Sequence, residues 1–340
     1  MSTEWFGLSL AAPEAEARRQ RHQRGDNHVR PRRLLSLVAL VVLACATAAA
    51  QGKDYSTIVV FGDSLSDTGN VTHLAYEEYG IPAPGPYVNY TLGSFTDGPD
   101  TVPAARKYFG VWIKQFADAL PSHPPVMDSL DGGTNYAYGF ATTGNGTSPL
   151  TFDSDTVQVE NIGQQITDYL STHPKIDNHT LFVVWGGAVN LLYASSSTDV
   201  ANAAIQQTLN IERLIEAGAT QFLIPNLPPL GRVPEFNGSL ATSVPATAAS
   251  LLFNSYLATG ISVLKDLNAG KHLTIYQLDV FNLLLRVVVT PGLYGLSNVT
   301  AEAQGNASVN PDKYLFWDDL HPTTKGHNIL ADAALSLVTQ

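Results

Sequence analysis

Cysteine is almost absent from this 340-residue chain, which has a single one, Cys45. A disulfide bond within the chain is therefore excluded, although a secreted protein would be allowed one. After residue 50, no repeat, low-complexity tract or linker divides the sequence. The remaining residues, about 290 of them, are enough to bury one large core without cross-links. We therefore expect a single domain over residues 51–340.

Basic residues are scarce after residue 50. The whole chain has 19 basic residues (Lys and Arg) and 30 acidic residues (Asp and Glu). The first 50 residues contain seven of the basic and four of the acidic residues. Residues 51–340 therefore carry 12 basic and 26 acidic side chains, a net charge of −14. Such a surface repels nucleic acid and anionic lipid. We expect no nucleic-acid partner and no stable membrane association, with a monomer as the default.

The first 50 residues differ from the rest in composition. Residues 1–33 form a basic arm, residues 34–44 are apolar, and residues 46–50 are small and end in Ala48-x-Ala50. This order is typical of a secretory signal peptide, and the apolar run is shorter than the ~20 residues that span a bilayer. We expect residues 1–50 to be removed and the protein to be secreted. An uncleaved anchor and a start codon placed too far upstream stay as alternatives.

Seven Asn-x-Ser/Thr motifs follow this segment and fit passage through a glycosylating pathway. They lie at Asn70, Asn89, Asn145, Asn178, Asn237, Asn298 and Asn306. We expect Asn70 and Asn145 to stay unmodified because they fall within the motif segments described below.

Short apolar runs alternate with amphipathic stretches along the chain. The runs predict buried strands at 57–61, 181–185, 221–225 and 273–278, and the stretches predict helices at 112–120, 200–217 and 250–267. This alternation predicts a parallel sheet that helices cover on both faces. In such sheets the functional side chains lie at the carboxyl ends of the strands.

Two further stretches, 82–103 and 232–245, are rich in Pro and Gly and are predicted to be loops. The first contains Tyr87, Tyr90 and Phe95. These aromatic side chains either form one wall of a substrate cleft or anchor a long loop.

A serine and a histidine stand out at opposite ends of the domain. Residues 61–65 read Phe-Gly-Asp-Ser-Leu, which puts Ser64 where a predicted strand ends. A serine hydroxyl needs a positioned base to become a nucleophile. Residues 318–322 read Asp-Asp-Leu-His-Pro and supply His321 with a carboxylate three residues before it. The two segments together predict a serine hydrolase. The motif Gly-x-Ser-x-Gly does not occur, which argues against the α/β-hydrolase chain order.

Other chemistries fit the residues less well. His321 and His327 are six residues apart, with no Cys or Glu arrangement that completes a zinc site. Asp63 and Asp67 could act as a glycosidase pair, but that would leave the serine and histidine unexplained. Asp63 is expected instead to cap the turn, and Asp67 to bond the local backbone. We therefore expect no metal and no organic cofactor.

Two tryptophans lie next to the motif segments. Trp185 ends a predicted strand, and Trp317 precedes the aspartate pair. Each either serves as a platform for a sugar ring or packs in the core.

Five blocks of the chain resemble those of the GDSL esterases, also called SGNH hydrolases. They are residues 61–70, 135–143, 183–190 and 318–323, together with 225–231, which is similar to a segment of the plant and fungal members. The resemblance covers most of residues 55–335 with the blocks in family order. It implies a flavodoxin-like, three-layer α/β/α sandwich around a mostly parallel sheet of five strands. The subgroup that the chain resembles most is the fungal secreted acetylesterases of carbohydrate esterase family 16.

This resemblance implies a catalytic triad. Ser64 would attack the ester carbonyl, and His321 would take the serine proton and return it to the leaving alcohol. Asp318 would orient the imidazole and stabilise its charged form, with Asp319 as the rival carboxylate.

The resemblance also implies three donors to the negative oxygen of the intermediate: the N–H of Ser64, a glycine N–H of the second block and an Asn side chain of the third. The family's Gly-Gly is replaced by Gly139-Phe140, so the donor position falls on Phe140, which tolerates fewer backbone angles. In the third block an alignment without gaps puts Val189 at the Asn position, whereas one inserted residue would put Asn190 there. Asn190 is either that donor or an ordinary turn residue.

The resemblance implies a secreted esterase that hydrolyses small carboxylic esters through an acyl-serine intermediate. Acetyl groups on plant cell-wall carbohydrates are the expected substrate, and a crowding Phe140 would agree with a short acyl group. Two alternatives stay open: a lipase acting on longer acyl chains, and a catalytically impaired relative that binds carbohydrate.

Overall fold

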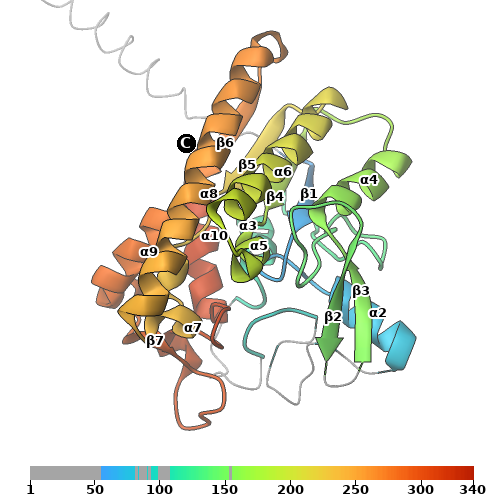
Figure 1. Cartoon of the computed structure of the whole chain (residues 1–340). Helices are drawn as coiled ribbons and strands as arrows, with labels where there is room; N and C mark the ends of the chain where they lie inside the picture. Colours follow the sequence, from blue (N-terminus) through green and yellow to red (C-terminus); the bar gives the residue numbers. More distant parts are fainter. Residues whose placement is uncertain (1–54, 81–82, 84–89, 91–92, 99–107, 153–154) are drawn as a thin grey trace, which may run out of the picture. The chain divides into compact units, whose positions relative to one another are not determined.

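A four-stranded parallel sheet forms the centre of the domain (Figure 1). The structure, a computed structural model, describes residues 55–80, 83, 90, 93–98, 108–152 and 155–340, so residues 1–50, Tyr87 and Asn89 lie outside the described residues. The strands run in the order β1 (Thr57–Gly62), β4 (Thr180–Trp185), β5 (Gln221–Pro225) and β6 (Thr274–Leu278). Each lies within one residue of the predicted strand at either end.

The expected fifth strand is replaced by a short extended segment beside β1. Residues 134–138 pair with β1 in parallel: the N–H of Val60 donates to Thr134 O, and the N–H groups of Tyr136 and Tyr138 donate to Val60 O and Gly62 O. Only an isolated bridge, between Val60 and Asn135, is regular enough to count as sheet. The described sheet therefore has four full strands, with irregular chain at the fifth position.

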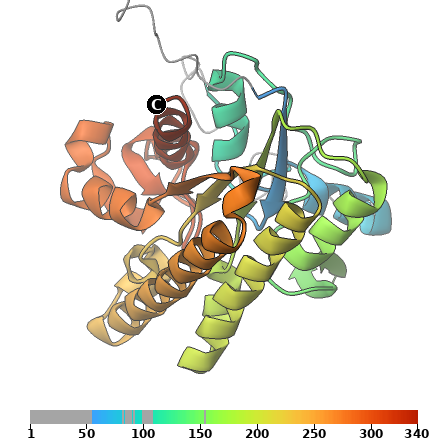
Figure 2. The ribbon, with the colours of Figure 1, turned by 90° about the horizontal axis from the view of Figure 1, so that it is seen from above.

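Two apolar clusters cover the two faces of the sheet and make the three-layer sandwich. Alternate residues of β1 point to opposite faces, as the strand period of two requires. Ile58 and Val60 join a cluster with α3 (Trp112–Ala119), α9 (Val280–Val289) and α10 (Thr324–Val338). Val59 and Phe61 join a cluster with α4 (Ile162–Thr172), α6 (Ser197–Glu216) and α8 (Leu240–Leu267). Figure 2 shows α4, α6 and α8 side by side on one face.

Smaller elements complete the described part of the chain. They are α2 (Asn70–Tyr79), the antiparallel pair β2 (Thr147–Phe152) and β3 (Asp155–Glu160), α5 (Ala188–Tyr193), η3 (Leu230–Arg232), α7 (Pro234–Asn237), η4 (Ala269–Lys271), η5 (Pro291–Tyr294), β7 (Asn298–Glu302), η6 (Pro311–Lys313) and β8 (Tyr314–Phe316).

The prediction of a loop at 232–245 is wrong, because most of these residues are helical. Helix α8 begins at Leu240, ten residues before the predicted start, and the Ser239 hydroxyl caps it by accepting the Thr242 N–H. Gly231 lets η3 lie directly on α8, since a Cβ there would sit 1.9 Å from the Ser243 carbonyl oxygen. Packing against the preceding turn thus extends the helix through Pro245, a residue that usually breaks helices.

Helix α8 is, among the described residues, the one helix long and apolar enough to cross a membrane. It packs against the sheet through Phe253, Leu257, Ile261 and Leu264, all of which are buried. These contacts hold one face of α8 against the domain, although only 28% of its apolar stretch is buried.

Candidate active site

Ser64 lies in a tight turn directly after β1. The carbonyl oxygen of Asp63 accepts the N–H groups of Ser66 and Asp67, at 3.0 and 3.1 Å, and the Asp63 carboxylate accepts the Leu65 N–H at 3.1 Å. Asp63 therefore caps the turn, as expected. The turn leaves the Ser64 hydroxyl only partly buried, next to an apolar cavity.

A second buried carboxylate, Asp67, holds the backbone around this turn. It accepts the N–H groups of Gly69 and Asn70, at the start of α2, and that of Gly139 at 2.8 Å. Burial raises the pKa of Asp67 to about 7, although these N–H donors act to lower it. Asp67 thus ties the nucleophile turn to the segment around Gly139.

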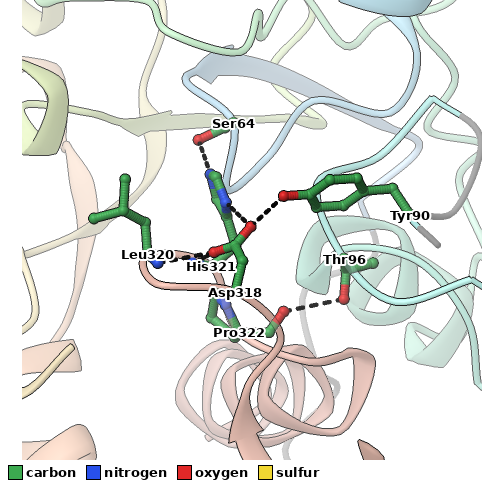
Figure 3. A network of polar contacts seen from close by, with 7 residues as sticks. All are labelled: Ser64, Tyr90, Thr96, Asp318, Leu320, His321 and Pro322. Atoms are coloured by element: carbon green, nitrogen blue, oxygen red, sulfur yellow. Dashed lines mark hydrogen bonds and ion pairs between the residues drawn. The ribbon is translucent and has the colours of Figure 1, made fainter. Parts of the chain in front are cut away.

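His321 and Asp318 come from the turn between β8 and α10 and reach Ser64 across the end of the sheet (Figure 3). Nε2 of His321 lies 2.8 Å from Oγ of Ser64, and Nδ1 lies 2.7 Å from Oδ2 of Asp318. The other Asp318 oxygen accepts the N–H groups of Leu320 and His321. Asp319 is exposed, with its carbonyl oxygen accepting the Glu235 N–H. The structure therefore joins Ser64, His321 and Asp318 and leaves Asp319 outside.

The electrostatics of the site favour an ion pair between His321 and Asp318. Burial works against a charged His321, but the neighbouring Asp318 carboxylate outweighs it and raises the histidine pKa above its ordinary value. Burial likewise works against a charged Asp318, yet the His321 charge and hydrogen bonds from His321 and Tyr90 lower its pKa to about 2. Asp318 is therefore ionised throughout the physiological range and can stabilise an imidazolium.

Tyr90 donates its hydroxyl to Oδ2 of Asp318 at 2.5 Å (Figure 3). Its ring lies edge-on to Phe95 and Trp317, and Phe95 packs on the His321 ring with centroids 5.3 Å apart. The sequence offered both a cleft wall and a loop anchor for Tyr90 and Phe95, and the contacts show that they brace the histidine and aspartate. No spacing rule could have paired Tyr90 with a residue 228 positions away.

The segment that carries Phe95 is fixed to the start of α10. The hydroxyl of Thr96 donates to the carbonyl oxygen of Pro322 at 3.1 Å, and the Asp97 carboxylate accepts the Thr324 N–H at 2.5 Å. These bonds flank the His321 turn on its C-terminal side. Sequence reasoning gave neither Thr96 nor Asp97 a role.

Two backbone N–H groups near Ser64 are candidates for the oxyanion hole. Neither the N–H of Ser64 nor that of Phe140 has a hydrogen-bond partner among the described residues. The N–H of Gly139, in contrast, is bound to Asp67, so Gly139 is not available as a donor. Phe140 adopts φ 70°, in the left-handed region that favours glycine. Residue 140 in the second block thus has a backbone conformation typical of glycine, although it is a phenylalanine.

The side chains of Asn190 and Val189, neighbours on α5, have different surroundings. The Oδ1 of Asn190 accepts the Thr143 N–H at 2.9 Å, which connects the second and third blocks. With Oδ1 fixed in this way, the Nδ2 group is the part of the amide that can donate elsewhere. Val189 is buried and lines the cavity beside Ser64, where it cannot donate.

Several other residues singled out in the sequence have structural roles. Trp185 and Trp317 are 1% and 2% exposed, so both pack in the core and neither is a sugar platform. Asn70 is fully buried, which agrees with an unmodified side chain, whereas Asn145 is exposed. His327 is buried within α10.

One cluster of possible metal ligands occurs among the described residues, outside the Ser64 site. His73, Asp128 and Asp131 bring their ligand atoms within 4.8 Å of one another. The two ring nitrogens of His73 already face carboxylates, Asp131 at 3.2 Å and Glu77 at 3.1 Å. The histidine and the acidic groups therefore pair with each other.

Comparisons of the sequence and the structure with known proteins agree on one family. The model of the family "GDSL-like Lipase/Acylhydrolase" matches residues 58–334. Among curated proteins, the chain is 28% identical to an uncharacterized protein of the trpE-trpG intergenic region of Pseudomonas putida, over 89% of this chain but only 52% of that protein, so it spans about half of that relative. It is 25% identical to the phosphatidylcholine-sterol acyltransferase of Aeromonas hydrophila, over 90% of this chain and 95% of the relative. It is also 25% identical to an Arabidopsis thaliana GDSL esterase/lipase, over 89% and 97%.

Solved structures resemble the chain more loosely. A lipolytic G-D-S-L family protein of Veillonella parvula covers 83% of this chain and 97% of its own, with 13% identity and a TM-score of 0.41. An acetyl xylan esterase covers 82% and 98%, with 11% identity and a TM-score of 0.41.

Proposed function

The chain belongs to the GDSL-like lipase/acylhydrolase family of carboxylic ester hydrolases, and from this premise we propose that it works through an acyl-serine intermediate on Ser64. The observation that carries the proposal is the continuous contact from Oγ of Ser64 through His321 to Asp318, at 2.8 and 2.7 Å. This is hydrogen-bonding distance for a base that must take the serine proton.

In the first half of the reaction, Ser64 Oγ forms a bond to the ester carbonyl carbon while its proton passes to Nε2 of His321. The intermediate collapses when the carbon–oxygen bond to the alcohol breaks and Nε2 protonates the leaving oxygen. Water then repeats the cycle on the acyl-serine and releases the acid. The N–H groups of Ser64 and Phe140, together with the Asn190 amide, would stabilise the negative oxygen in both halves.

Hydrolysis of a p-nitrophenyl ester, together with covalent labelling by a fluorophosphonate, tests the proposal. We expect the parent to release p-nitrophenol and to carry the label on Ser64, and Ser64→Ala to lose both by a factor of about 10⁴ or more. Ser66→Ala is the matched control, because the Ser66 hydroxyl accepts from the Trp112 indole instead of facing His321. A folded parent that neither labels nor hydrolyses would contradict the proposal and favour the impaired, carbohydrate-binding alternative.

The natural substrate is a finer part of the proposal. Resemblance to the fungal acetylesterases favours acetyl groups on cell-wall carbohydrates. The name of the Aeromonas relative, a phosphatidylcholine-sterol acyltransferase, favours the lipase alternative. The burial of Trp185 and Trp317 removes the two aromatic platforms that the sequence offered for a sugar. Release of acetate from acetylated xylan, compared with release of fatty acid from phospholipid, separates the two substrates.

We further propose that the enzyme acts outside the cell. The basic arm, the short apolar run and the Ala48-x-Ala50 exit support this proposal, as do the glycosylation motifs that follow. N-terminal sequencing of the protein from the medium and from the membrane fraction tests it: a start near residue 51 in the medium is expected, and a chain that keeps residues 1–50 in the membrane fraction would indicate an anchor.

A further inference from the structure

The first part of helix α8 lies outside the core of the domain. With 28 residues, α8 is about 42 Å long, whereas the strands that it covers have five or six residues and reach about 20 Å. The buried residues of α8 begin at Ser250 and end at Leu264. Residues 240–249 are all described, and none of them is buried. The core therefore holds the second part of α8 and leaves the first part at the surface.

An apolar stripe runs along this first part of α8. Leu240, Val244 and Leu251 are 81%, 59% and 52% exposed, and their spacing of four and seven residues puts them on one side of the helix. Three further exposed residues on this side are also apolar, namely Ala241, Pro245 and Ala248. We call these six residues the α8 stripe. A helix that is apolar on all sides is normally enclosed by a core or a bilayer, so the exposed stripe indicates a contact surface.

Charge is absent from this part of the chain. Residues 236–264 contain no Asp, Glu, Lys, Arg or His. The α8 stripe consists of Leu, Val, Ala and Pro and has no Trp, Tyr or Arg, the residues that dominate protein–protein contacts. Uncharged aliphatic side chains suit a hydrocarbon surface, because the gain from leaving water depends on area and not on direction. The net charge of −14 over residues 51–340 favours a neutral lipid surface over an anionic one.

A groove joins the α8 stripe to the cavity beside Ser64. One side of the groove is formed by three stripe residues, Ala241, Pro245 and Ala248, and the other by α5 and the chain that follows it. The groove has a volume of about 590 Å³, and none of the described residues that line it is ionisable. Leu192 and Leu230 line both the groove and the cavity, which extends from Ser64 under α9. An ester in a lipid surface that covers the stripe therefore has an apolar route to the nucleophile.

We propose that the α8 stripe docks the enzyme on a neutral lipid surface and so presents the esters of that surface to Ser64. The presentation of esters rests on the proposed acyl-serine function, whereas the docking does not. Docking is reversible, because six aliphatic side chains bury far less apolar area than a membrane-spanning helix does. It is therefore compatible with the expectation that no stable membrane association forms.

Substitutions by glutamine remove the apolar surface of the stripe. The triple variant carries Leu240→Gln, Val244→Gln and Leu251→Gln. These changes leave the net charge unaltered, and glutamine is a good helix former, so we expect α8 to stay folded. The matched control carries Val263→Gln and Leu267→Gln, because these residues are 49% and 72% exposed at the other end of the same helix.

Co-flotation with phosphatidylcholine vesicles measures docking without any need for activity. It is carried out in a Ser64→Ala background, so that no lipid is consumed. All proteins compared carry the same N-terminal segment, so differences between them report on α8 alone. We expect the parent to float with the vesicles, the triple variant to bind at least about tenfold more weakly, and the control to stay within about twofold of the parent.

Activity on esters within vesicles measures presentation to Ser64. Hexadecyl acetate and p-nitrophenyl palmitate, embedded in phosphatidylcholine, place the long chain on the alcohol side and on the acyl side. With the Ser64 hydroxyl present, the triple variant should lose about tenfold in rate on the embedded ester that the parent hydrolyses. Its kcat/KM on soluble p-nitrophenyl acetate should stay within about twofold, since none of the three substituted residues lines the cavity beside Ser64.

Four results would contradict parts of the proposal. Failure of the parent to float, flotation only with anionic vesicles, or an equal loss in the control would overturn docking. A parent that is dimeric by light scattering and becomes monomeric in the triple variant would show that a second copy covers the stripe. A parent that floats but hydrolyses neither embedded ester, or is no faster than the triple variant, would overturn presentation to Ser64. Docking without Ser64-dependent hydrolysis of any ester would overturn the proposed function and leave the docking standing.

Discussion

The catalytic triad and the candidate oxyanion hole lie around the same serine, but their groups are in opposite states. Ser64, His321 and Asp318 are already joined by hydrogen bonds of 2.7 and 2.8 Å. The N–H groups of Ser64 and Phe140 have no partners among the described residues. The groups that move protons are thus paired in the resting protein, while the groups suited to a negative oxygen are left without partners.

This difference has a physical reason. Ser64 and Phe140 are only half-buried, so water can bind these N–H groups until a negative oxygen forms on the substrate. Phe140 is strained as well, since a non-glycine residue at φ 70° is uncommon. N–H groups that no other protein group occupies are suited to the charge of the transition state.

The largest change to the triad, apart from loss of Ser64, should come from Asp318→Asn. The amide cannot stabilise an imidazolium and favours the wrong tautomer of His321, so we expect kcat to fall by about 10⁴-fold. Asp319→Asn is the matched control: the same change one residue away, at an exposed side chain, should stay within about twofold. Ester hydrolysis by both variants checks this, and equal losses would remove Asp318 from the triad.

The oxyanion side can be tested at Asn190 with two substitutions. Asn190→Ala should lower kcat by about 100- to 1000-fold with little change in KM, if the amide donates to the oxyanion. Asn190→Asp keeps the oxygen that accepts the Thr143 N–H but loses the Nδ2 donor. We therefore expect it to be at least as inactive as Asn190→Ala. Near-parental activity of Asn190→Asp would show that Asn190 only holds the second block in place.

The same contrast explains what could be predicted from the sequence. Triad chemistry depends on side-chain type, so Ser64, His321 and Asp318 could be named before their positions were known. The four strands were predictable to within one residue because β1, β4 and β5 are short apolar runs with both faces covered, and β6, at the edge of the sheet, still has buried Ile275 and Leu278.

What could not be predicted depends on the backbone or on distant contacts. The fifth strand position, residues 134–138, has no apolar run, since its pairing rests on hydrogen bonds to β1 along one edge. The hydrogen bond from the Gly139 N–H to Asp67, which leaves Phe140 as the donor of the second block, joins residues 72 positions apart in the chain. The cavity under α9 depends on side chains from many separate segments, and no local pattern describes such a space.

The smallest effect on activity should come from loss of the Tyr90 hydroxyl, which donates to Asp318. Tyr90→Phe removes one donor to Asp318, which keeps the N–H groups of Leu320 and His321 and the imidazole itself. A hydrogen bond to a charged group contributes about 1.5–3 kcal/mol when its partner is left alone, so we expect a loss of about tenfold with the remaining donors in place. Tyr79→Phe is the matched control, because its hydroxyl donates to the Thr156 carbonyl oxygen.

The pH profile separates positioning by Tyr90 from a merely structural role. His321 must be neutral to accept the serine proton, and Asp318 raises the histidine pKa above its ordinary value of 6.5, so the parent's kcat/KM should fall as the pH drops through a midpoint above 6.5. Without the Tyr90 hydroxyl, Asp318 keeps more negative charge on the oxygen that faces the imidazole. The pKa of His321 then rises further, and the acid limb of Tyr90→Phe moves to higher pH. An unchanged midpoint with uniformly lower activity would show that Tyr90 supports the fold without tuning the triad.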